Sequence, residues 1–471
     1  MSPDLPSYDQ ATALVAAYCA HLARLRPSSE RVGLGLAAGR VLATPLYSDR
    51  DQPPFARSTR DGFACRALEA SRHRFLRLAG ATRAGDPPAG PLPKGAAWEI
   101  MTGAPVPAGA DAVMMIEHAD QAGARVRLLP PRKIATGENI VAQGAQALAG
   151  DELLAAGTAI QAAQIALAAA CGCAALEVFI RPRVAILATG DELVPVESSP
   201  APGQIRNSNA PMLAAMVEAA GGEPWILPTA ADEAQSLDAA LAQSADADLL
   251  LITGGVSAGK FDLVEPALAR AGARFHFTGV RIQPGKPLVF GELPVRNACT
   301  IQEGYGTRCF FGLPGNPVSS AVTFLLFAAP VLAALAGRCA RGPRFALARL
   351  ASRAGKHGKP GLTRFLPASC TFGGTAIDSA DKLSALGAPS FSRALGAPSF
   401  PVAAANRGDR KGWESTPSSP SRIDGQLPEV ALVPMQGSGD LAALARSNCF
   451  LVVPEEAHNL DAGAIVRILL P

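Results

Sequence analysis

The chain has 471 residues, of which 48% are apolar and 18% are charged. This length is too great for one ordinary hydrophobic core, so the sequence predicts two to four domains. The formal net charge of +3 is small for such a chain and gives no basic field of the kind that binds nucleic acid. The composition therefore indicates a globular, multidomain protein without a nucleic-acid partner.

The nine cysteines are scattered, with no C-x-x-C pair and no Cys/His cluster at zinc spacing. Reduced thiols, packed as small apolar side chains, indicate a cytoplasmic protein. The N-terminal MSPDLPSYDQ lacks the basic-then-apolar pattern of a signal peptide. Residues 318–337 are apolar enough to suggest a membrane span, but this run contains three hydroxyl side chains and Pro330. We therefore expect a buried core helix and no membrane partner.

Along the first 180 residues the sequence pattern changes twice, from helical to strands and turns and back to helical. Residues 8–26 show the apolar spacing of an amphipathic helix, whereas the next 120 residues contain short strands and turns. An Ala-rich segment with helical character follows over 151–180. Helical stretches on both sides of a β-rich module indicate an inserted domain. We therefore expect a helical linker domain formed by 1–26 and 148–181, and an inserted β-rich domain over 27–147.

Strands and helices alternate over 182–337. Strands are expected at 183–190, 248–255 and 307–315, and helices at 209–222 and 263–273. This alternation is typical of a mostly parallel, doubly wound α/β sheet. In such sheets ligands bind beyond the carboxyl ends of the strands. The sequence therefore predicts a ligand site at that edge.

Residues 338–471 predict a small C-terminal β domain. It is interrupted at about 385–422 by two copies of ALGAPSF and a Ser/Pro/Arg-rich stretch. Two copies are too few for a solenoid. The composition and turn content of this segment predict a disordered surface insertion.

Polar residues follow the predicted strands of the α/β domain. They are Asp191 and Glu192 after the first strand, and Ser257, Lys260 and Asp262 after the second, where they follow the glycines Gly254 and Gly255. Consecutive glycines let backbone N–H groups approach an anion, although the spacing is not that of a Walker A loop. Two interpretations of Asp262 remain open, because it could hold a metal or only cap the helix near residue 263.

The last strands of this domain are followed by two further candidate loops. Lys286 lies between Gly285 and Pro287, so its ammonium is presented on a restrained loop. Asn316 and Pro317 form a helix-start signal whose free N–H groups make an anion site, with Ser319 in the first turn. Carboxylates, a lysine and hydroxyls at one edge suit an anionic ligand held with Mg²⁺.

Eight stretches occur in a characteristic order along the chain: TRDGFA (59–64), MTGAPVPAGADAV (101–113), GENI (137–140), TGDEL (189–193), TGGVSAGKFD (253–262), QPGKP (283–287), GLPGNPVSS (312–320) and QGSGDLAALARSNC (436–449). This ordered set resembles the molybdopterin molybdenumtransferase family, to which the E domain of gephyrin is related. The resemblance covers nearly the whole chain apart from 385–422.

The resemblance implies an elongated, cytoplasmic homodimer of four-domain subunits, with an α/β domain like that of molybdopterin adenylyltransferases. The implied reaction inserts molybdenum from molybdate into adenylylated molybdopterin and releases AMP, forming the molybdenum cofactor. The molybdopterin adenylyltransferase and molybdoenzyme apoproteins are the implied protein partners. The implied cleft combines the α/β domain of one subunit with the inserted domain of the other.

The resemblance also implies roles for residues at matching positions. The implied catalytic residues are Asp61, Glu192, Asp232 and Asp262, of which Glu192 and Asp262 are the implied Mg²⁺ ligands. The implied substrate-binding residues are Thr102, Ser257, Lys286, Pro314, Asn316, Pro317, Ser319 and Ser438.

Four positions depart from the family pattern: Val141, Gln146, Gln283 and Leu362. The family pattern often has Arg at the position of Val141, Lys at that of Gln283 and Arg at that of Leu362, and we expect weaker molybdate binding unless Arg364 or Lys260 replaces the lost charge. Two other functions remain as alternatives, a molybdopterin adenylyltransferase and a non-catalytic scaffold like gephyrin. AMP release on addition of molybdate would favour the main hypothesis, whereas formation of the adenylate from ATP would favour the first alternative.

Overall fold

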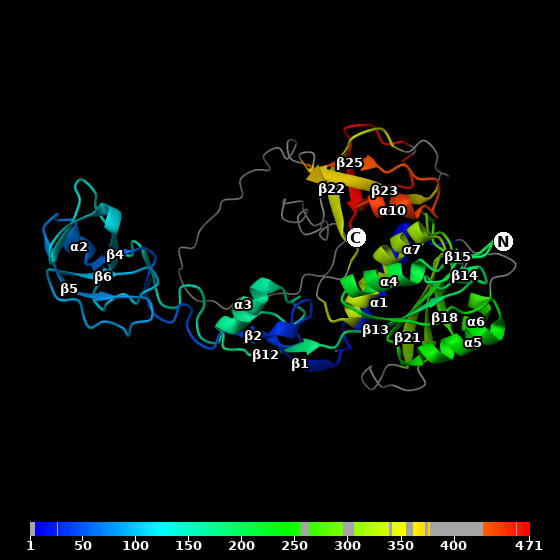
Figure 1. Ribbon diagram of the computed structural model, residues 1–471, viewed down its shortest axis with the longest axis horizontal. Coiled ribbons are helices and arrows are strands. Elements are labelled where there is room, and N and C mark those ends of the chain that lie inside the picture. Colours follow the sequence, from blue (N-terminus) through cyan, green and yellow to red (C-terminus); the bar gives the residue numbers. More distant parts are fainter. Residues whose placement is uncertain are drawn as a thin grey trace. The chain divides into compact units, whose positions relative to one another are not determined.

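The computed structural model describes residues 5–25, 27–255, 263–294, 306–338, 342–354, 361–372, 375–376, 427–457 and 459–471. The chain forms two compact units (Figure 1). One unit comprises Met1–Glu30 and Phe179–Pro471, and the other comprises Arg31–Val178. The chain passes between them within β1 (Ser29–Gly33) and again within β12 (Ala175–Phe179).

The unit Arg31–Val178 contains a six-stranded sheet in the order β7-β4-β6-β5-β9-β8. Its strands are β4 (Gly62–Cys65), β5 (Leu76–Thr82), β6 (Ala96–Ile100), β7 (Ala112–Met115), β8 (Ala119–Ala122) and β9 (Arg125–Leu128). Alternate residues of β4 enter different buried clusters, Phe63 and Cys65 in one and Ala64 in another. Such alternation is the period of a strand buried on both faces. The predicted β-rich texture is confirmed.

Shorter elements complete this unit. They are η1 (Leu34–Leu36), β2 (Leu46–Tyr47), β3 (Arg57–Ser58), α2 (Ala67–Ala70), η2 (Ile116–His118), β10 (Ile140–Val141), β11 (Glu152–Leu154) and α3 (Ala162–Ala170). Helix α3 is shorter than predicted, because Gly172 with φ 76° follows its C-cap and the chain then enters β12. The Ala-rich run over 151–180 therefore forms one short helix between strands.

Helix α1 (Tyr8–Leu22) begins with a capping box, in which Ser7 Oγ accepts from Gln10 N and Gln10 Oε1 accepts from Ser7 N. Its buried residues Ala11 and Val15 belong to the core of the α/β domain. Helix α3 instead packs in a cluster confined to Arg31–Val178. The two helical segments expected to share one linker domain thus lie in different cores, because amphipathic spacing does not specify the core against which a helix packs. The four-domain boundaries themselves stay a prediction.

The α/β domain contains a six-stranded sheet in the order β16-β13-β17-β21-β20-β18. Its strands are β13 (Arg183–Ala188), β16 (Glu223–Ile226), β17 (Leu249–Thr253), β18 (Arg274–Phe277), β20 (Val289–Pro294) and β21 (Thr307–Leu313). The first four strands in the sheet order are parallel, and β20 runs antiparallel to both of its neighbours. The connecting elements are β14 (Leu193–Val194), β15 (Ile205–Arg206), α4 (Asn209–Ala219), α5 (Ala234–Gln243), η3 (Ser244–Asp246) and α6 (Val264–Arg270).

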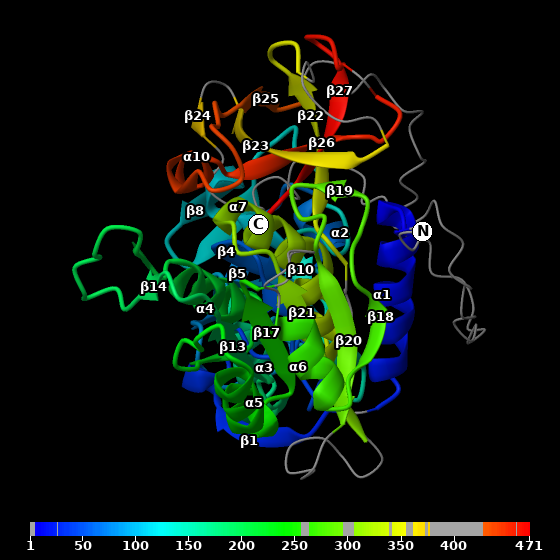
Figure 2. The same cartoon turned by 90° about the vertical axis from the view of Figure 1, so that its right-hand side faces the viewer.

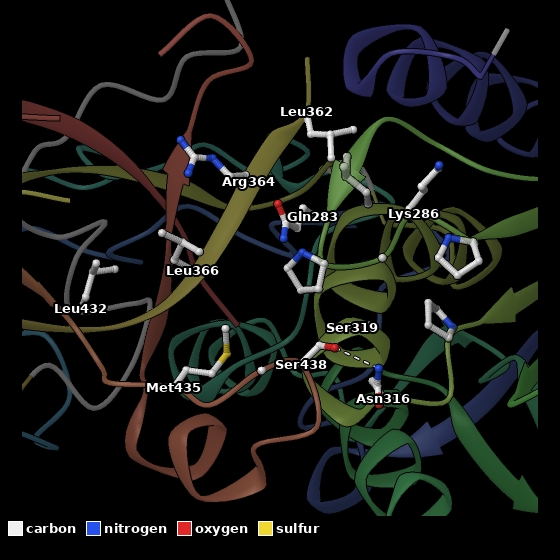
Figure 3. Close-up of a pocket in the computed structure, with 16 residues that line it drawn as sticks. Gln283, Lys286, Asn316, Ser319, Leu362, Arg364, Leu366, Leu432, Met435 and Ser438 are labelled. Atoms are coloured by element: carbon white, nitrogen blue, oxygen red, sulfur yellow. Dashed lines mark hydrogen bonds between the residues drawn. The ribbon is translucent and has the colours of Figure 1, made fainter. Parts of the chain in front are cut away.

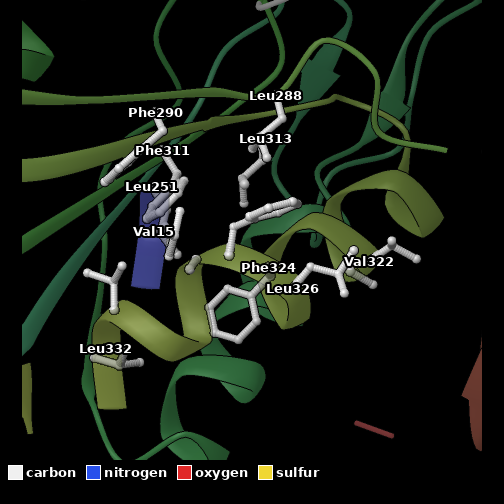
Figure 4. Close-up of a cluster of buried hydrophobic side chains, with 14 of the residues drawn as sticks. Val15, Leu251, Leu288, Phe290, Phe311, Leu313, Val322, Phe324, Leu326 and Leu332 are labelled. Carbon is white, nitrogen blue, oxygen red and sulfur yellow. The ribbon is translucent and has the colours of Figure 1, made fainter. Parts of the chain in front are cut away.

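Both faces of this sheet are covered by helices, as the strands' continuous apolar runs require. On one face, Val184 and Leu249 pack with α1, α4 and the apolar helix that follows β21. Figure 4 shows Leu251 of this sheet face with Val15 of α1 and Phe324 of the apolar helix. On the other face, Ala185 and Leu250 pack with α5 and α6, which lie together in Figure 2. The predicted doubly wound α/β arrangement is confirmed.

The apolar helix over Pro317–Leu335 consists of α7 (Pro317–Thr323), a π-helical segment η4 (Phe324–Ala328) and α8 (Ala329–Leu335). Pro330 lies at the start of α8, where its missing N–H removes one i→i−4 hydrogen bond. The helix is long and apolar enough to cross a membrane, but 83% of its most apolar window is buried inside the protein. The predicted core helix is confirmed.

The C-terminal part contains β22 (Phe345–Leu350), β23 (Thr363–Phe372), β24 (Thr375–Ala376), β25 (Glu429–Leu432), α10 (Leu441–Arg446), β26 (Cys449–Val453) and β27 (Ile465–Leu469). Five strands pair in the closed cycle β23-β25-β22-β27-β26-β23, which makes a small barrel. Strand β19 (Ile282–Gln283), from the α/β part of the chain, adds to β23. The predicted insertion at 385–422 lies outside the described residues.

Candidate active site

A large cavity of about 860 Å³ lies where the α/β domain meets the barrel (Figure 3). Its lining comes from the 282–287 loop, the start of α7, strand β23 and the loop before α10. The lining residues are Ile282, Gln283, Pro284, Gly285, Lys286, Pro287, Pro314, Asn316, Ser319, Leu362, Arg364, Leu366, Leu432, Met435, Gly437 and Ser438. A mainly apolar lining with a few polar groups is typical of small-molecule sites.

Lys286 lies on a loop whose backbone is held on both sides. Before it, β19 pairs in parallel with β23, and Gly285 approaches the core helix so closely that a Cβ there would lie 2.5 Å from Thr323 Cγ2. The carbonyl of Lys286 itself accepts from Val280 N at 2.9 Å. The side chain is exposed and, among the described residues, its ammonium makes no ion pair. Lys286 thus lines the large cavity with an exposed side chain, and its role in binding stays a prediction.

Asn316 is the N-cap residue of α7 by position, but its side chain does not cap the helix. Its amide Nδ2 instead donates to Ser438 Oγ of the barrel at 2.9 Å, a contact drawn in Figure 3. Val318 N also donates to the Ser438 carbonyl at 3.1 Å. The helix start therefore joins the barrel, and the expectation that its first-turn N–H groups are free is wrong for Val318.

The other predicted residues of this helix start differ in position. Pro314 and Ser319 line the large cavity, and Ser319 is only 3% exposed. Pro317 lines neither of the two cavities described here and serves as the first residue of the helix. Its part in the site is therefore to fix the backbone.

Two of the departures from the family pattern, Gln283 and Leu362, line the large cavity. Arg364 lies opposite Gln283 in the β19–β23 pairing and also lines it. Arg364 is 6% exposed as a residue, and its guanidinium donates to the Ala457 carbonyl at 3.1 Å, so part of its donor capacity serves the barrel. Its role as a replacement cation stays a prediction.

A smaller cavity of about 250 Å³ adjoins the first at the carboxyl ends of β13, β17 and β21. It is lined by Thr189, Gly190, Glu192, Asp232, Gly254, Gly255, Pro287, Pro314, Gly315 and Asn316. Three of these residues, Pro287, Pro314 and Asn316, also line the large cavity. The predicted ligand edge of the sheet thus carries two cavities with a common wall.

Carboxylates gather on one side of the smaller cavity. Asp191 Oδ1 accepts from Asp232 N at 3.0 Å, and Glu192 and Asp232 both line the cavity. Burial raises the pKa of Asp232, and the negative charges of Asp191 and Glu192 raise it further. Within the described ranges, no group of three or more His, Cys, Asp or Glu residues forms a metal-binding cluster. The predicted Glu192–Asp262 metal pair cannot be tested there, since Asp262 lies outside these ranges.

The glycine-rich loop after β17 is described only at its start. Gly254 and Gly255 adopt φ values of 93° and 58°, and a Cβ on Gly254 would clash with the Thr189 carbonyl. The predicted residues Ser257 and Asp262, together with Lys260, lie outside the described residues. Where the chain resumes, Leu263 occupies the N-cap position of α6 without a side-chain cap.

The predicted residues Asp61 and Thr102 lie together within the unit Arg31–Val178. Asp61 directly precedes β4 and Thr102 follows β6, and these two strands pair with Gly62 opposite Ile100. Thr102 N donates to Asp61 Oδ1 at 2.6 Å. Hydrogen bonds from the backbone and side chain of Thr102 lower the pKa of Asp61. This carboxylate is therefore held in its ionised form.

Sequence reasoning missed the barrel's apolar wall of the large cavity, formed by Leu366, Leu432 and Met435. These residues lie in or near strands whose alternation predicts burial but not a ligand surface. The signal that could have found Met435 is its place directly before the QGSG stretch.

The fold and cavities define a class of protein: an α/β protein with two adjoining cavities at the carboxyl edge of a mostly parallel sheet, the edge where such sheets bind ligands, against a β-barrel. Three family models match the chain in order. The MoeA N-terminal region (domain I and II) matches residues 6–172, the probable molybdopterin binding domain matches 185–334, and the MoeA C-terminal region (domain IV) matches 419–470. The chain belongs to the MoeA family.

Curated relatives of this chain carry the name molybdopterin molybdenumtransferase. One from Haemophilus influenzae is 30% identical over 445 residues, covering 93% of this chain and 93% of the relative. One from Nostoc sp. is 38% identical over 315 residues, covering 66% of this chain and 70% of the relative. The crystal structure of the molybdopterin biosynthesis moeA protein from Pyrococcus horikoshii OT3 is similar over 99% of this chain and 100% of its own, with 25% identity and a TM-score of 0.71.

Proposed function

We propose that this protein is a molybdopterin molybdenumtransferase that takes adenylylated molybdopterin and molybdate, inserts molybdenum and releases AMP. The observation that carries the proposal is family membership along nearly the whole chain, with the predicted substrate-binding residues Lys286, Ser319 and Ser438 together around one cavity. These residues lie far apart in the sequence, and folding alone brings them together.

The large cavity suits a pterin that carries anionic groups. Its apolar surface, which includes Leu366 and Met435, can cover the flat ring system. At the rim, the Lys286 ammonium and the Ser319 and Ser438 hydroxyls are donors that match the oxygens of molybdate and phosphate. The common wall at Pro314 and Asn316 would let one ligand extend into the smaller cavity.

We infer that the smaller cavity holds Mg²⁺ through Glu192 and Asp262, with Asp232 beside them. Carboxylate oxygens are the donors that this hard cation prefers. Burial and, after it, the negative charges of Asp191 and Glu192 raise the pKa of Asp232, which supports the fit because a cation would relieve the repulsion between these charges. When bound, Mg²⁺ would neutralise charge on the phosphate groups of the substrate.

The Mg²⁺ proposal can be tested without an activity measurement. Titrating the carboxyl groups by NMR should show the pKa of Asp232 falling when Mg²⁺ is added, because the cation favours the ionised form. Glu192→Gln should also lower this pKa, since one negative charge is removed. If the pKa of Asp232 is unchanged in millimolar Mg²⁺, the proposal that this cavity binds the metal is wrong.

The decisive test of the function is AMP release from adenylylated molybdopterin, measured with and without molybdate. Molybdate-dependent release is expected. Formation of the adenylate from ATP would instead show an adenylyltransferase, and the absence of both reactions would favour a scaffold. We further propose that the protein works in the cytoplasm, between the adenylyltransferase that would supply its substrate and the molybdoenzymes that would receive its product.

We also infer that the protein acts as a homodimer to which both subunits contribute active-site residues. Asp61→Ala and Asp262→Ala should each be nearly inactive alone. Random co-assembly makes about half of the dimers mixed, each with one site free of both substitutions, so about a quarter of the wild-type activity should return. No recovery in the mixture would place both residues in the site of a single subunit.

A further inference from the structure

We infer that Asn209, which carries no role in the proposed reaction above, is a positioning residue of this active site. Its carboxamide holds the turn formed by residues 314–316, which is the wall common to the two cavities. This inference rests on the proposed function, because the effect on catalysis follows only if the cavities bind the substrates.

The turn needs such a restraint because packing does not supply one. Pro314 is buried, but Gly315 and Asn316 are exposed and line the smaller cavity. On the barrel side the turn is held by Asn316, whose amide donates to Ser438 Oγ. On the sheet side the restraint comes from Asn209, the first residue of α4.

The Asn209 amide Nδ2 makes two hydrogen bonds at once. It donates to the Gly315 carbonyl at 2.6 Å and to Thr253 Oγ1, at the end of β17, at 2.9 Å. The Gly315 carbonyl can only accept, so the orientation of the amide is determined and both of its hydrogens are used. The amide therefore connects the start of α4 with the end of β17 and with the turn that follows β21.

The bonds continue into the core. The Thr253 hydroxyl lies 3.4 Å from the Pro314 carbonyl and 3.4 Å from Ser320 Oγ, and the Ser320 hydroxyl also donates to the Pro314 carbonyl. Thr253 is 2% exposed and Ser320 is fully buried. Water does not reach these buried groups, so a displaced donor would leave its acceptor without a hydrogen bond. One position of the turn is therefore favoured.

The same carboxamide leaves Asn209 Oδ1 buried and, among the described residues, without a hydrogen-bond partner. A buried acceptor without a hydrogen bond costs free energy, so this orientation is not the one that would give the Asn209 carboxamide the most hydrogen bonds. The arrangement instead satisfies the turn, as expected of a group whose role is to hold the cavity wall.

Asn209→Asp is the direct test, because it keeps the shape and replaces both donors with an acceptor that faces the Gly315 carbonyl. The matched control is Asn207→Asp, which adds the same charge two residues before the start of α4. Asn207 Oδ1 accepts from Ala210 N at 3.1 Å, and its Nδ2 donates to Thr229 Oγ1 at 3.3 Å, so the control does not touch the turn. Asn209→Ser serves as a second test variant without added charge, and thermal melts establish that all variants fold.

Two quantities are measured on the full chain: hydrogen exchange of the amides over 310–320, and kcat/KM for molybdate-dependent AMP release. Asn209→Asp and Asn209→Ser should speed exchange of the Val318 amide by about tenfold or more and lower kcat/KM by roughly tenfold to a hundredfold, the scale of a displaced reacting group. Asn207→Asp should leave both at the wild-type level.

Each other result overturns the inference. Test variants that match the control in exchange would show that the turn is held by other groups. Faster exchange with unchanged kcat/KM would show that the position of the turn is irrelevant to catalysis, and slower catalysis with unchanged exchange would place Asn209 in another role. Failure of the wild-type protein to release AMP would instead refute the proposed function, while the exchange measurement would still decide whether Asn209 holds the turn.

Discussion

At the scale of single residues, two charged side chains differ in their surroundings: the Asp61 carboxylate is hydrogen-bonded within the protein, and the Lys286 ammonium is exposed. The Asp61 carboxylate accepts from Thr102 N at 2.6 Å, and hydrogen bonding by the backbone and side chain of Thr102 lowers its pKa. The Lys286 ammonium is instead exposed at a cavity rim on a backbone that is held on both sides. One group is thus fixed in its charged form, and the other is available to a ligand.

Thr102→Val should raise the pKa of Asp61, since the hydroxyl donor is lost while the backbone N–H remains. The pKa of Asp61 is lower in the folded than in the unfolded protein, so the stability that this interaction contributes is present above the unfolded pKa. It is lost as the pH falls through the folded pKa. Carboxyl NMR titration should therefore show the variant losing this contribution at a higher pH than the wild type. An unchanged pKa would mean that the backbone bond alone sets it.

Lys286→Ala should raise the molybdate concentration needed for half-maximal AMP release by roughly ten- to a hundredfold, the usual value of a hydrogen bond to a charged group. Because the side chain is exposed, the free energy of unfolding should change by no more than about 0.5 kcal/mol. Lys286→Arg, which keeps the charge, should recover part of the affinity. A molybdate dependence identical to the wild type would exclude Lys286 from the site.

At the scale of elements, the helix over Pro317–Leu335 connects the site to the core. Its start contacts the barrel through Ser438, and its middle packs on the sheet through Phe324 and Phe327. Tyr8 of α1 lies with its ring 6.3 Å from that of Phe327 and 5.5 Å from that of Phe365 in β23. This aromatic cluster joins three elements from distant parts of the chain.

Phe327→Ala should lower the free energy of unfolding by about 3–5 kcal/mol, because Phe327 is fully buried and its loss leaves a cavity. Leu36→Ala is the control, since Leu36 is 74% exposed and its substitution should cost less than about 0.5 kcal/mol. Urea denaturation followed by fluorescence and circular dichroism measures both. A cost below about 1 kcal/mol for Phe327→Ala would show that the helix does not form part of the main core.

At the scale of the whole molecule, the chain is organised as two units with separate cores. Three buried clusters contain only residues of Arg31–Val178. The other three contain only residues of Met1–Glu30 and Phe179–Pro471. Each unit therefore buries its own apolar surface, which is the physical requirement for a domain that folds independently.

The fragment 31–178 should accordingly fold when expressed alone, with dispersed NMR spectra and a cooperative thermal transition. The transition should coincide with one of two resolved transitions of the full chain in calorimetry. A fragment that remains unfolded, or a full chain that unfolds in a single transition, would show that the stability of this unit depends on the rest of the chain.

The sequence alone determined the elements with strong local signals. The apolar runs of β13, β17 and β21 predict strands buried on both faces, and Asn316-Pro317 predicts the start of the long helix. These signals are local, because periodicity and the fixed φ of proline act within a few residues. The order of the motifs also indicated the family, and thereby most of the residues around the two cavities.

Only the tertiary structure decided which partners these residues have. Asn316 has a cap residue's sequence context, yet its side chain bonds to Ser438, 122 residues away. Helix α1 has the spacing of any amphipathic helix, and only the fold shows that it packs in the α/β core. Likewise, Asn209 reaches Gly315 across 106 residues. Contacts of this length depend on how the strands are ordered and how the barrel closes, and no local pattern records either.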